Sequence, residues 1–307
     1  MFKRHLIFGA MLAISAMANA VELEFQAAYV IDGKENLQPS GLAVCDGKVV
    51  FVSDKHEGEI FQLAFDQGGV ATAETWKELH ELPEPPKQAF GWWMSFKRFV
   101  SEVLGFSGGA DWEGITCDHQ GNLYLASEYY FSVLKVDQTG KKEWLIDGLY
   151  KTGHDKGLFQ KDNAYIEGIS IDEDGLLLAA EREPRGFISV NKGAAAVYVQ
   201  PGPQISEEGL PYDYAGLDVY QGKNIVLERN HYKVCDFSKA FETKACYSFK
   251  SVAMSSDWGY DTGKYGLAEG LAIDGESLWI IVDNNGDARK SNPDDHRSTI
   301  FRFRNPF

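Results

Sequence analysis

One pattern recurs in five segments of this 307-residue chain, and this repeat limits the possible folds more than any other feature of the sequence. Each segment runs from a glycine-containing tetrapeptide through a short apolar stretch and a tight turn into a second apolar stretch that ends in an acid. The first positions of the segments are Ser40, Glu113, Glu167, Ala215 and Glu269. The closing acids are Asp54, Glu128, Glu181, Glu228 and Asp283, at offsets of 14, 15, 14, 13 and 14 residues from those starts.

The repeated segments are typical of antiparallel β-hairpins. Turns such as Asp46-Gly47 and Asp174-Gly175 join short strands tightly. A third strand follows the acid, for example at 59–63, and a fourth is visible at 142–145. About four antiparallel strands per unit, repeated along the chain, predict an all-β fold of the β-propeller class. Five starts predict five blades, and six remain open if one blade has lost the pattern.

Two segments at the N-terminal end have separate interpretations. Lys3 and Arg4 precede an apolar run at 6–17, and Ala18-Asn19-Ala20 then has the small residues of a cleavage site, which predicts a signal peptide over 1–20. We therefore expect one propeller domain over 21–307, in the periplasm or secreted. The strand predicted over 22–31 has no repeat of its own, so we expect it to form the outer strand of the last blade and to close the ring.

A helical pattern interrupts the first repeat interval. Over 89–106 the apolar and aromatic residues fall largely on one face, with Lys97, Arg98 and Glu102 elsewhere, which predicts an amphipathic helix. Three interpretations stay open: a helix packed on a blade, a lid over a pocket, or an interfacial membrane contact. No apolar run after the signal peptide reaches the roughly 18 residues of a membrane-spanning helix.

The charge and the cysteines narrow the partners and the compartment. A formal net charge of −15 repels phosphate backbones, so we expect no nucleic-acid partner. Four cysteines in an oxidising compartment predict two disulfides. Cys235 and Cys246 flank a predicted hairpin, and Cys45 and Cys117 occupy nearly equivalent places in successive repeats. The alternative is that some of these thiols stay free and buried.

The first positions of the repeats predict a metal site. The first strand of each propeller blade lines the central channel, so these residues should converge on the axis. Three converging carboxylates repel one another unless a cation joins them, and Ca²⁺ takes six to eight oxygen ligands. We therefore expect Ca²⁺ to be held by Glu113, Glu167 and Glu269, helped by Ser40 and the Ala215 carbonyl. The alternatives are that each glutamate pairs with a basic side chain or backbone N–H, or that the ion is purely structural.

The closing acids form a second predicted ring at the channel mouth. Basic residues follow them closely, including Lys55, Arg182 and Arg229. Alternating carboxylates and guanidiniums suit a phosphate-bearing ligand, and salt bridges between blades are the equally open alternative. The oxygen-rich segment 283–287 could hold another cation. No nucleophile elbow, zinc-protease motif or P-loop is present, so the sequence does not favour a serine hydrolase.

The repeated motifs also carry a family resemblance. The run Asp111-Trp112-Glu113-Gly114-Ile115 and its counterparts Ile166-Glu167-Gly168-Ile169 and Ala268-Glu269-Gly270-Leu271, with Val226-Leu227-Glu228-Arg229 and Val282-Asp283-Asn284-Asn285, resemble the phytase-like family described as "esterase-like activity of phytase". The resemblance covers roughly 39–303. The Ser and Glu residues before glycine are also similar to those of calcium-activated nucleotidases (apyrases), five-bladed propellers with an axial Ca²⁺, and Ala215 stands where a serine would fit that pattern.

These observations lead to one leading hypothesis and two rivals. The leading hypothesis is an exported, monomeric, calcium-dependent hydrolase of phosphoesters or esters, with water activated by the cation. Arg182 and Arg229 would contact phosphate, Glu128 or Glu181 would act as base, and Lys55, Asp54, Glu228 and Asp283 would complete the ligand site. The main rival is a non-catalytic module that Ca²⁺ stabilises and whose mouth binds a ligand or protein. A lactonase-type hydrolase is the third possibility.

Overall fold

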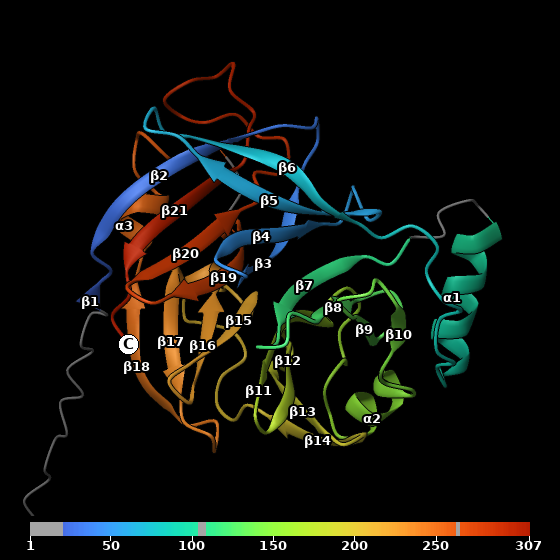
Figure 1. Cartoon of the computed structure of the whole chain (residues 1–307). Coiled ribbons are helices and arrows are strands. Elements are labelled where there is room, and N and C mark those ends of the chain that lie inside the picture. The colour runs from blue at the N-terminus through green and yellow to red at the C-terminus, as the bar shows by residue number, and fades with distance from the viewer. Residues whose placement is uncertain (1–20, 104–108, 262–264) are drawn as a thin grey trace, which may run out of the picture.

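The protein is described by a computed structural model that covers residues 21–103, 109–261 and 265–307. The predicted signal peptide and positions 104–106 of the predicted helix lie outside these residues. Strands dominate the structure and are arranged around a centre from which antiparallel sheets radiate, as Figure 1 shows. Within the described ranges, no helix is long and apolar enough to cross a membrane. The expected all-β, propeller-type architecture is therefore confirmed.

Each sequence repeat forms a four-stranded antiparallel unit or most of one. The first unit holds β3 (Pro39–Cys45), β4 (Lys48–Ser53), β5 (Glu59–Phe65) and β6 (Val70–Glu78). The second holds β7 (Trp112–Cys117), β8 (Leu123–Ser127), β9 (Ser132–Val136) and β10 (Lys142–Trp144). The third holds β11 (Ile166–Asp172), β12 (Gly175–Ala180), β13 (Gly186–Asn191) and β14 (Ala194–Val199).

The last two units take strands from both ends of the described chain. The fourth holds β15 (Gly216–Tyr220), β16 (Lys223–Glu228), β17 (Lys233–Phe237) and β18 (Thr243–Ser248), and β1 (Val21–Glu22) pairs with β18 in parallel. The fifth holds β19 (Ala268–Asp274), β20 (Ser277–Val282), β21 (Thr299–Arg304) and β2 (Phe25–Asp32). The expected N-terminal outer strand is thus confirmed as β2.

The first strands of the units form a continuous inner layer. β3 contacts β7 and β19, and β11 and β15 complete the circuit between them. The glycine after each first position lies where two of these strands meet most closely. A Cβ atom added to Gly41 would lie 2.6 Å from Gly114 Cα, and one added to Gly270 would lie 2.7 Å from Leu42 Cβ. Only glycine allows the strands to approach this closely.

The hydrophobic core is divided among the junctions between neighbouring units. Within the described part of the chain, one cluster of buried apolar side chains joins each unit to the next, and one joins the fifth to the first. At that closing junction, Phe51 and Phe61 of the first unit pack in one cluster with Trp279 and Ile300 of the fifth. Most apolar burial therefore holds units together, so a unit removed from its neighbours would expose much of its core.

The remaining elements are short helices and disulfides. The helices are α1 (Trp92–Val103), α2 (Leu149–Asp155), the 3₁₀ turn η1 (Arg229–His231) and α3 (Lys250–Ala253). The helix expected around 89–106 is confirmed as α1, which lies at the outside of the ring beside the second unit in Figure 1. Both expected disulfides are present: Cys45–Cys117 joins the first two units, and Cys235–Cys246 joins β17 to β18.

Candidate functional site at the centre of the ring

The first residue of four repeats lies at an irregularity in the strand pairing. Ser40, Glu113, Glu167 and Glu269 are each the residue that the pairing register of the first strand skips, so each lies in a β-bulge. A bulge leaves one residue unpaired and redirects its side chain, and bulges are frequent beside functional sites. The sequence repeat therefore marks a real structural position, at which three carboxylates and one hydroxyl leave the regular pleat.

A cavity of about 770 Å³ opens at this end of the inner strands. We call it the mouth. All four bulge residues named above, Ser40 and the three glutamates, line it. Among the described residues that line the mouth, seven have carboxylate side chains and three have cationic side chains. The carboxylates belong to Asp54, Glu113, Glu167, Glu181, Glu183, Glu269 and Asp283, and the cations to Lys161, Arg182 and Arg229. The mouth is therefore strongly acidic.

Arg229 lies among four carboxylates, three from the mouth and one, Asp213, from outside its lining. Its Nε donates to Asp213 Oδ2 at 2.8 Å, Nη1 donates to Glu269, and Nη2 donates to Glu181. Glu167 Oε1 lies 3.7 Å from Nη2. We call these five side chains the Arg229 cluster. A guanidinium has five N–H donors in a fixed plane, and here carboxylates surround it on several sides. Arg229 thus lies between Glu167 and Glu269, where the sequence predicted a metal ion.

Burial and the close charges shift the pKa values in this cluster. Burial lowers the pKa of Arg229, but the carboxylates of Glu269, Glu167 and Asp213 outweigh it and raise the pKa well above its usual value. Burial raises the pKa of Glu269 to about 8, although Arg229 opposes this shift. Burial raises the pKa of Glu167 as well, again against Arg229. One guanidinium therefore compensates only part of the negative charge gathered around it.

A second group of carboxylates has no such guanidinium. One oxygen from each of Asp111, Glu113 and Glu128 lies within 4.8 Å of the others. We call these three residues the Asp111 cluster. Within the described ranges, no lysine or arginine forms an ion pair with any of them. Three close carboxylates without a counter-ion are the arrangement that a hard divalent cation stabilises, because such ions prefer carboxylate oxygens.

The Asp111 cluster is assembled from neighbouring strands and held by hydrogen bonds to the backbone. Glu57 Oε1 accepts from the Asp111 N–H at 3.0 Å, and Glu57 Oε2 accepts from the Ala110 N–H at 2.5 Å. Asp111 has a φ of 51°, in the left-handed region that aspartate tolerates better than most residues. Glu128 Oε1 accepts from the Tyr165 N–H at 3.1 Å. The cluster is therefore positioned by the first, second and third units together.

The pKa values of the Asp111 cluster are all raised. Burial, with the charges of Asp54 and Glu57, raises the pKa of Asp111 to about 6. Burial and the Glu167 charge raise the pKa of both Glu113 and Glu128 well above the ordinary value. Each group is thus pushed toward its neutral form by its surroundings, and a bound cation would reverse that direction.

The structure separates the remaining predicted ligands. Ser40 is buried, and its hydroxyl donates to the Trp112 carbonyl, next to Glu113. Ala215 is fully buried in the cluster between the fourth and fifth units and does not line the mouth. Of the five residues predicted to bind the metal, only Glu113 belongs to the Asp111 cluster, whereas Glu167 and Glu269 belong to the Arg229 cluster.

The second predicted ring is also divided. Asp54 Oδ2 accepts from Lys55 Nζ at 2.6 Å, and this hydrogen bond raises the pKa of Lys55. Glu181 Oε1 pairs with both Arg182 and Arg229, whereas its buried Oε2 has no hydrogen-bond partner among the described residues. Arg182 Nη2 also donates to the Asn163 carbonyl at 2.9 Å.

Glu228 and Asp283 complete that ring. Burial raises the pKa of Glu228 to about 7 and that of Asp283 to about 6. Asp283 lines the mouth, and Glu228 does not. Asp54, Glu181 and Asp283 are therefore brought together at the mouth, with Arg182 and Arg229, whereas Glu128 joins the Asp111 cluster and Glu228 stays apart.

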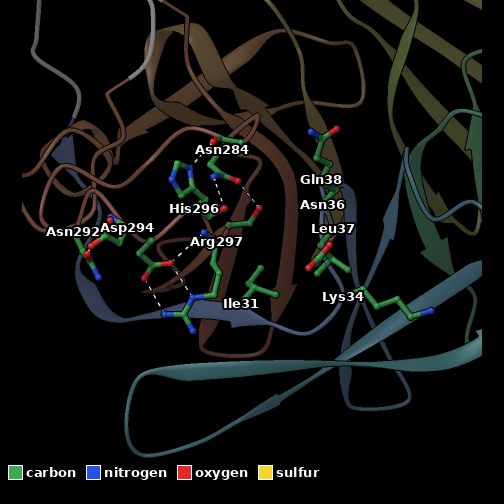
Figure 2. Close-up of a pocket in the computed structure, with 14 residues that line it drawn as sticks. Ile31, Lys34, Asn36, Leu37, Gln38, Asn284, Asn292, Asp294, His296 and Arg297 are labelled. Carbon is green, nitrogen blue, oxygen red and sulfur yellow. Dashed lines mark hydrogen bonds and ion pairs between the residues drawn. The ribbon is translucent and has the colours of Figure 1, made fainter.

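The oxygen-rich segment that begins at Asp283 borders a second cavity, shown in Figure 2. Asn284 Nδ2 donates to the carbonyls of Asp287 and His296, at 2.6 and 2.8 Å, and Asn284 Oδ1 accepts from Ser298 at 3.0 Å. His296 Nδ1 lies 2.7 Å from the Gly286 carbonyl. The polar atoms of Asn284 and several of its neighbours thus form hydrogen bonds within the loop and stabilise its conformation.

Two residues of the site escaped the sequence reasoning. Asp111 lies two positions before Glu113 in a run whose likeness to a family was noted, and among the other repeats only the fourth has an acid at the equivalent position. Asp213 lies two positions before Ala215, and it is fully buried against Arg229. An acid two residues before the first repeat position is the shared signal that could have identified both.

Comparisons with known proteins bear on the fold. No family model and no curated protein matches the sequence. A glutaminyl cyclase from Myxococcus xanthus is similar in structure, with a TM-score of 0.53 and 12% identity over 93% of this chain and 98% of that chain. At this identity the similarity shows a shared fold and no shared activity.

Weaker similarities extend to other enzymes. An aldose sugar dehydrogenase from Streptomyces coelicolor, solved in its PQQ-bound form, has a TM-score of 0.46 and 13% identity, over 90% of this chain and 98% of that chain. A virginiamycin B lyase from Staphylococcus aureus has a TM-score of 0.42 and 13% identity over 80% of this chain, and the chain spans 64% of that lyase.

Proposed function

We propose that this protein is an exported, five-bladed β-propeller that binds Ca²⁺ through Asp111, Glu113 and Glu128. The proposal keeps Glu113 from the sequence-based ligand set and replaces its other members. It is supported by the close approach of the three carboxylate oxygens and by the lack of an ion-pair partner for them among the described residues. Oxygen donors without histidine or cysteine fit a hard cation such as Ca²⁺ better than zinc.

We further propose that the site hydrolyses a phosphoester or ester, in keeping with the resemblance to the phytase-like family. The observation that carries this step is the double position of Glu113, which belongs to the Asp111 cluster and also lines the mouth. A cation held there would face a space that can admit a substrate, and such an ion supplies charge stabilisation and activates water.

The side chains around the mouth have distinct roles in this proposal. Arg182 and Lys161 line the mouth, and each has one carboxylate partner, Glu181 and Glu183 respectively, whereas Arg229 has four. We therefore assign Arg182 and Lys161 to holding a phosphate. Glu181 Oε2 is buried without a hydrogen-bond partner among the described residues and is the acceptor for a proton leaving the attacking water. Arg229 is already surrounded by four carboxylates. We therefore assign it to holding the site together instead of to binding phosphate.

Melting and hydrolysis measured together test this function. The purified protein is melted in EDTA and in Ca²⁺, and release of nitrophenol from nitrophenyl phosphate and nitrophenyl acetate is followed in both. We expect Ca²⁺ to raise the melting temperature, since a ligand that binds only the folded state stabilises it by about 2.7 kcal/mol at a hundredfold excess over Kd. We also expect it to raise the hydrolysis rate.

Matched variants assign both effects to the site. Glu113→Gln should remove the rise in melting temperature and the rise in rate, whereas Glu143→Gln, which changes an exposed glutamate on β10, should keep both. Stabilisation by Ca²⁺ without hydrolysis of either ester would contradict the proposed hydrolase activity. No response to Ca²⁺ in either assay would overturn the metal site as well.

A non-catalytic module is the second candidate function. It is favoured by the Arg229 cluster, in which ion pairs connect side chains from the third, fourth and fifth units. Ion pairs of this kind can stabilise the ring in a protein that catalyses no reaction, and Ca²⁺ in the Asp111 cluster would add to that stability. The two disulfides are in keeping with an oxidising compartment for either function.

A further inference from the structure

An aromatic groove adjoins the mouth. It has a volume of about 880 Å³ and lies between α1 and α2. Its aromatic lining consists of Phe90, Trp92, Tyr150, Phe159 and Tyr165. Trp92 is 79% exposed, so its ring is accessible to a ligand. Tyr150 and Phe159 are buried and pack against each other, and Phe159 also packs against Tyr165, so the most exposed ring that the groove offers to a planar ligand is that of Trp92.

Direct contacts connect this groove to the proposed metal site. Tyr165, at the groove, donates its backbone N–H to Glu128 of the Asp111 cluster at 3.1 Å. Lys161 lines both the groove and the mouth. A molecule seated in the groove can therefore extend past Lys161 into the mouth, with its reacting group beside Glu113.

Side chains from the middle of α1 contact residues next to the Asp111 cluster and the mouth. Arg98 Nη1 donates to the Tyr129 carbonyl at 2.8 Å, and Tyr129 follows Glu128 in the chain. The Arg98 guanidinium also lies 3.8 Å from the centre of the Tyr129 ring. Lys97 pairs with Asp162, which follows Lys161. These contacts hold the helix that carries Trp92 beside the loops of the site, so Trp92 has a defined position relative to the mouth.

The charge of the mouth limits the ligand further. Carboxyl groups outnumber cations there by seven to three. Burial favours the neutral form of some of these groups, since it raises the pKa of Glu269 to about 8, but the mouth still has more acidic than basic side chains. A ligand with one phosphate can use the proposed Ca²⁺ together with Lys161 and Arg182, whereas each additional phosphate would meet carboxylates. The remainder of the substrate should accordingly be uncharged.

We propose that the substrate is a monophosphate ester of an aromatic alcohol, whose phosphate enters the mouth and whose ring stacks in the groove against Trp92. This inference rests on the proposed function and narrows it to one substrate class. It assigns a binding role to α1, the helix in the first repeat interval, and makes Trp92 a specificity-determining residue. Trp92 takes no part in bond breaking, so its role can be separated from the chemistry.

Binding of stable analogues tests the inference without relying on turnover. Phenylphosphonate, methylphosphonate and inositol hexakisphosphate are titrated into the Ca²⁺-loaded protein by calorimetry. We expect phenylphosphonate to bind most tightly. Trp92→Ala should weaken its binding three- to tenfold, the range of one aromatic stacking contact, and should leave methylphosphonate unchanged.

A second aromatic residue on α1 supplies the control. Phe99 is 61% exposed and does not line the groove, so Phe99→Ala should change neither affinity. Equal loss of both phosphonates in Trp92→Ala, no preference for the phenyl compound, or tightest binding of inositol hexakisphosphate would each overturn the inference. Selective phenylphosphonate binding without hydrolysis of any ester would support the inference and overturn the hydrolase.

Discussion

The Arg229 cluster and the Asp111 cluster are built from equivalent positions of the repeat, yet their charges are balanced differently. Glu269 and Glu113 occupy the same bulge position in their units, but Glu269 receives a hydrogen bond from Arg229, and Glu113 lies beside two further acids. One arginine, supplied by the turn after β16, accounts for the contrast. Repetition of the backbone therefore fixes where carboxylates gather, and individual side chains decide what neutralises them.

The largest expected effect breaks the Arg229 cluster. Arg229→Met should lower the free energy of unfolding by about 3–5 kcal/mol, because it leaves several buried carboxylates without their partner. Urea unfolding at neutral pH measures the change. Arg304→Met, which removes an exposed pair with Glu24 at 3.1 Å, is the matched control and should change stability little. Equal small effects would show that the guanidinium does not hold the ring.

A smaller loss is expected from one acid of the same cluster. Asp213 is fully buried and accepts from Arg229 Nε at 2.8 Å and from the Asn230 N–H at 3.1 Å. Asp213→Asn removes the charge and keeps the volume, so it should cost about 1–3 kcal/mol, the range for a charged hydrogen bond. Urea unfolding in EDTA measures it, and an unchanged midpoint would contradict the assignment.

The same substitution in the Asp111 cluster should act in the opposite direction. Asp111→Asn removes one of three mutually repelling acids, and asparagine also tolerates the left-handed backbone there. We expect the metal-free protein to gain about 1 kcal/mol, because the charged form of Asp111 is disfavoured where it lies. Melting in EDTA measures the gain in stability without metal. Melting in Ca²⁺ then measures the rise in melting temperature on metal binding, which should be smaller than in the unaltered protein. A loss of stability in EDTA would contradict the contrast between the clusters.

The smallest expected effect is a pH dependence of the metal-free protein. The pKa of Asp111 is raised to about 6 in the folded state from an ordinary value of 3.8. Between these values the folded state binds more protons than the unfolded state, so stability is fully present below about pH 4 and falls as the pH rises through 6. The melting temperature in EDTA should fall by a few degrees over this window, and less in Asp111→Asn. A melting temperature that rises over this window would contradict the predicted direction of the pH dependence.

Much of the fold could be predicted from the sequence, because strand length, turn residues and repeat spacing are local properties. The hairpins, the outer strand β2, the helix α1 and both disulfides follow from that pattern. The charge arrangement of the site could not be predicted in the same way. The repeat specifies the position of Glu113 and Glu269 in their strands. The ion pair between Arg229 and Glu269, in contrast, joins two different units and depends on the assembled ring.

Asp111 illustrates the same limit from the other side. It lies two residues before the first repeat position, where only the fourth unit also has an acid, and its place beside Glu113 and Glu128 depends on a loop held by Glu57 of the preceding unit. No property of the Asp111 segment alone indicates that contact. Residues that a site takes from loops between repeats are therefore harder to find than those that it takes from the repeated strands.

The pairing of β2 with β21 has a consequence for the order of folding. β2 pairs in parallel with β6 of the first unit, which is close to it in the sequence, whereas its antiparallel partner β21 lies more than 260 residues further along the chain. The sheet of the fifth unit is therefore complete only when these two distant strands meet. Contacts this distant along the chain slow folding. A chain of this topology must therefore avoid association before the two strands meet, and its formal net charge of −15 helps to keep molecules apart during that interval.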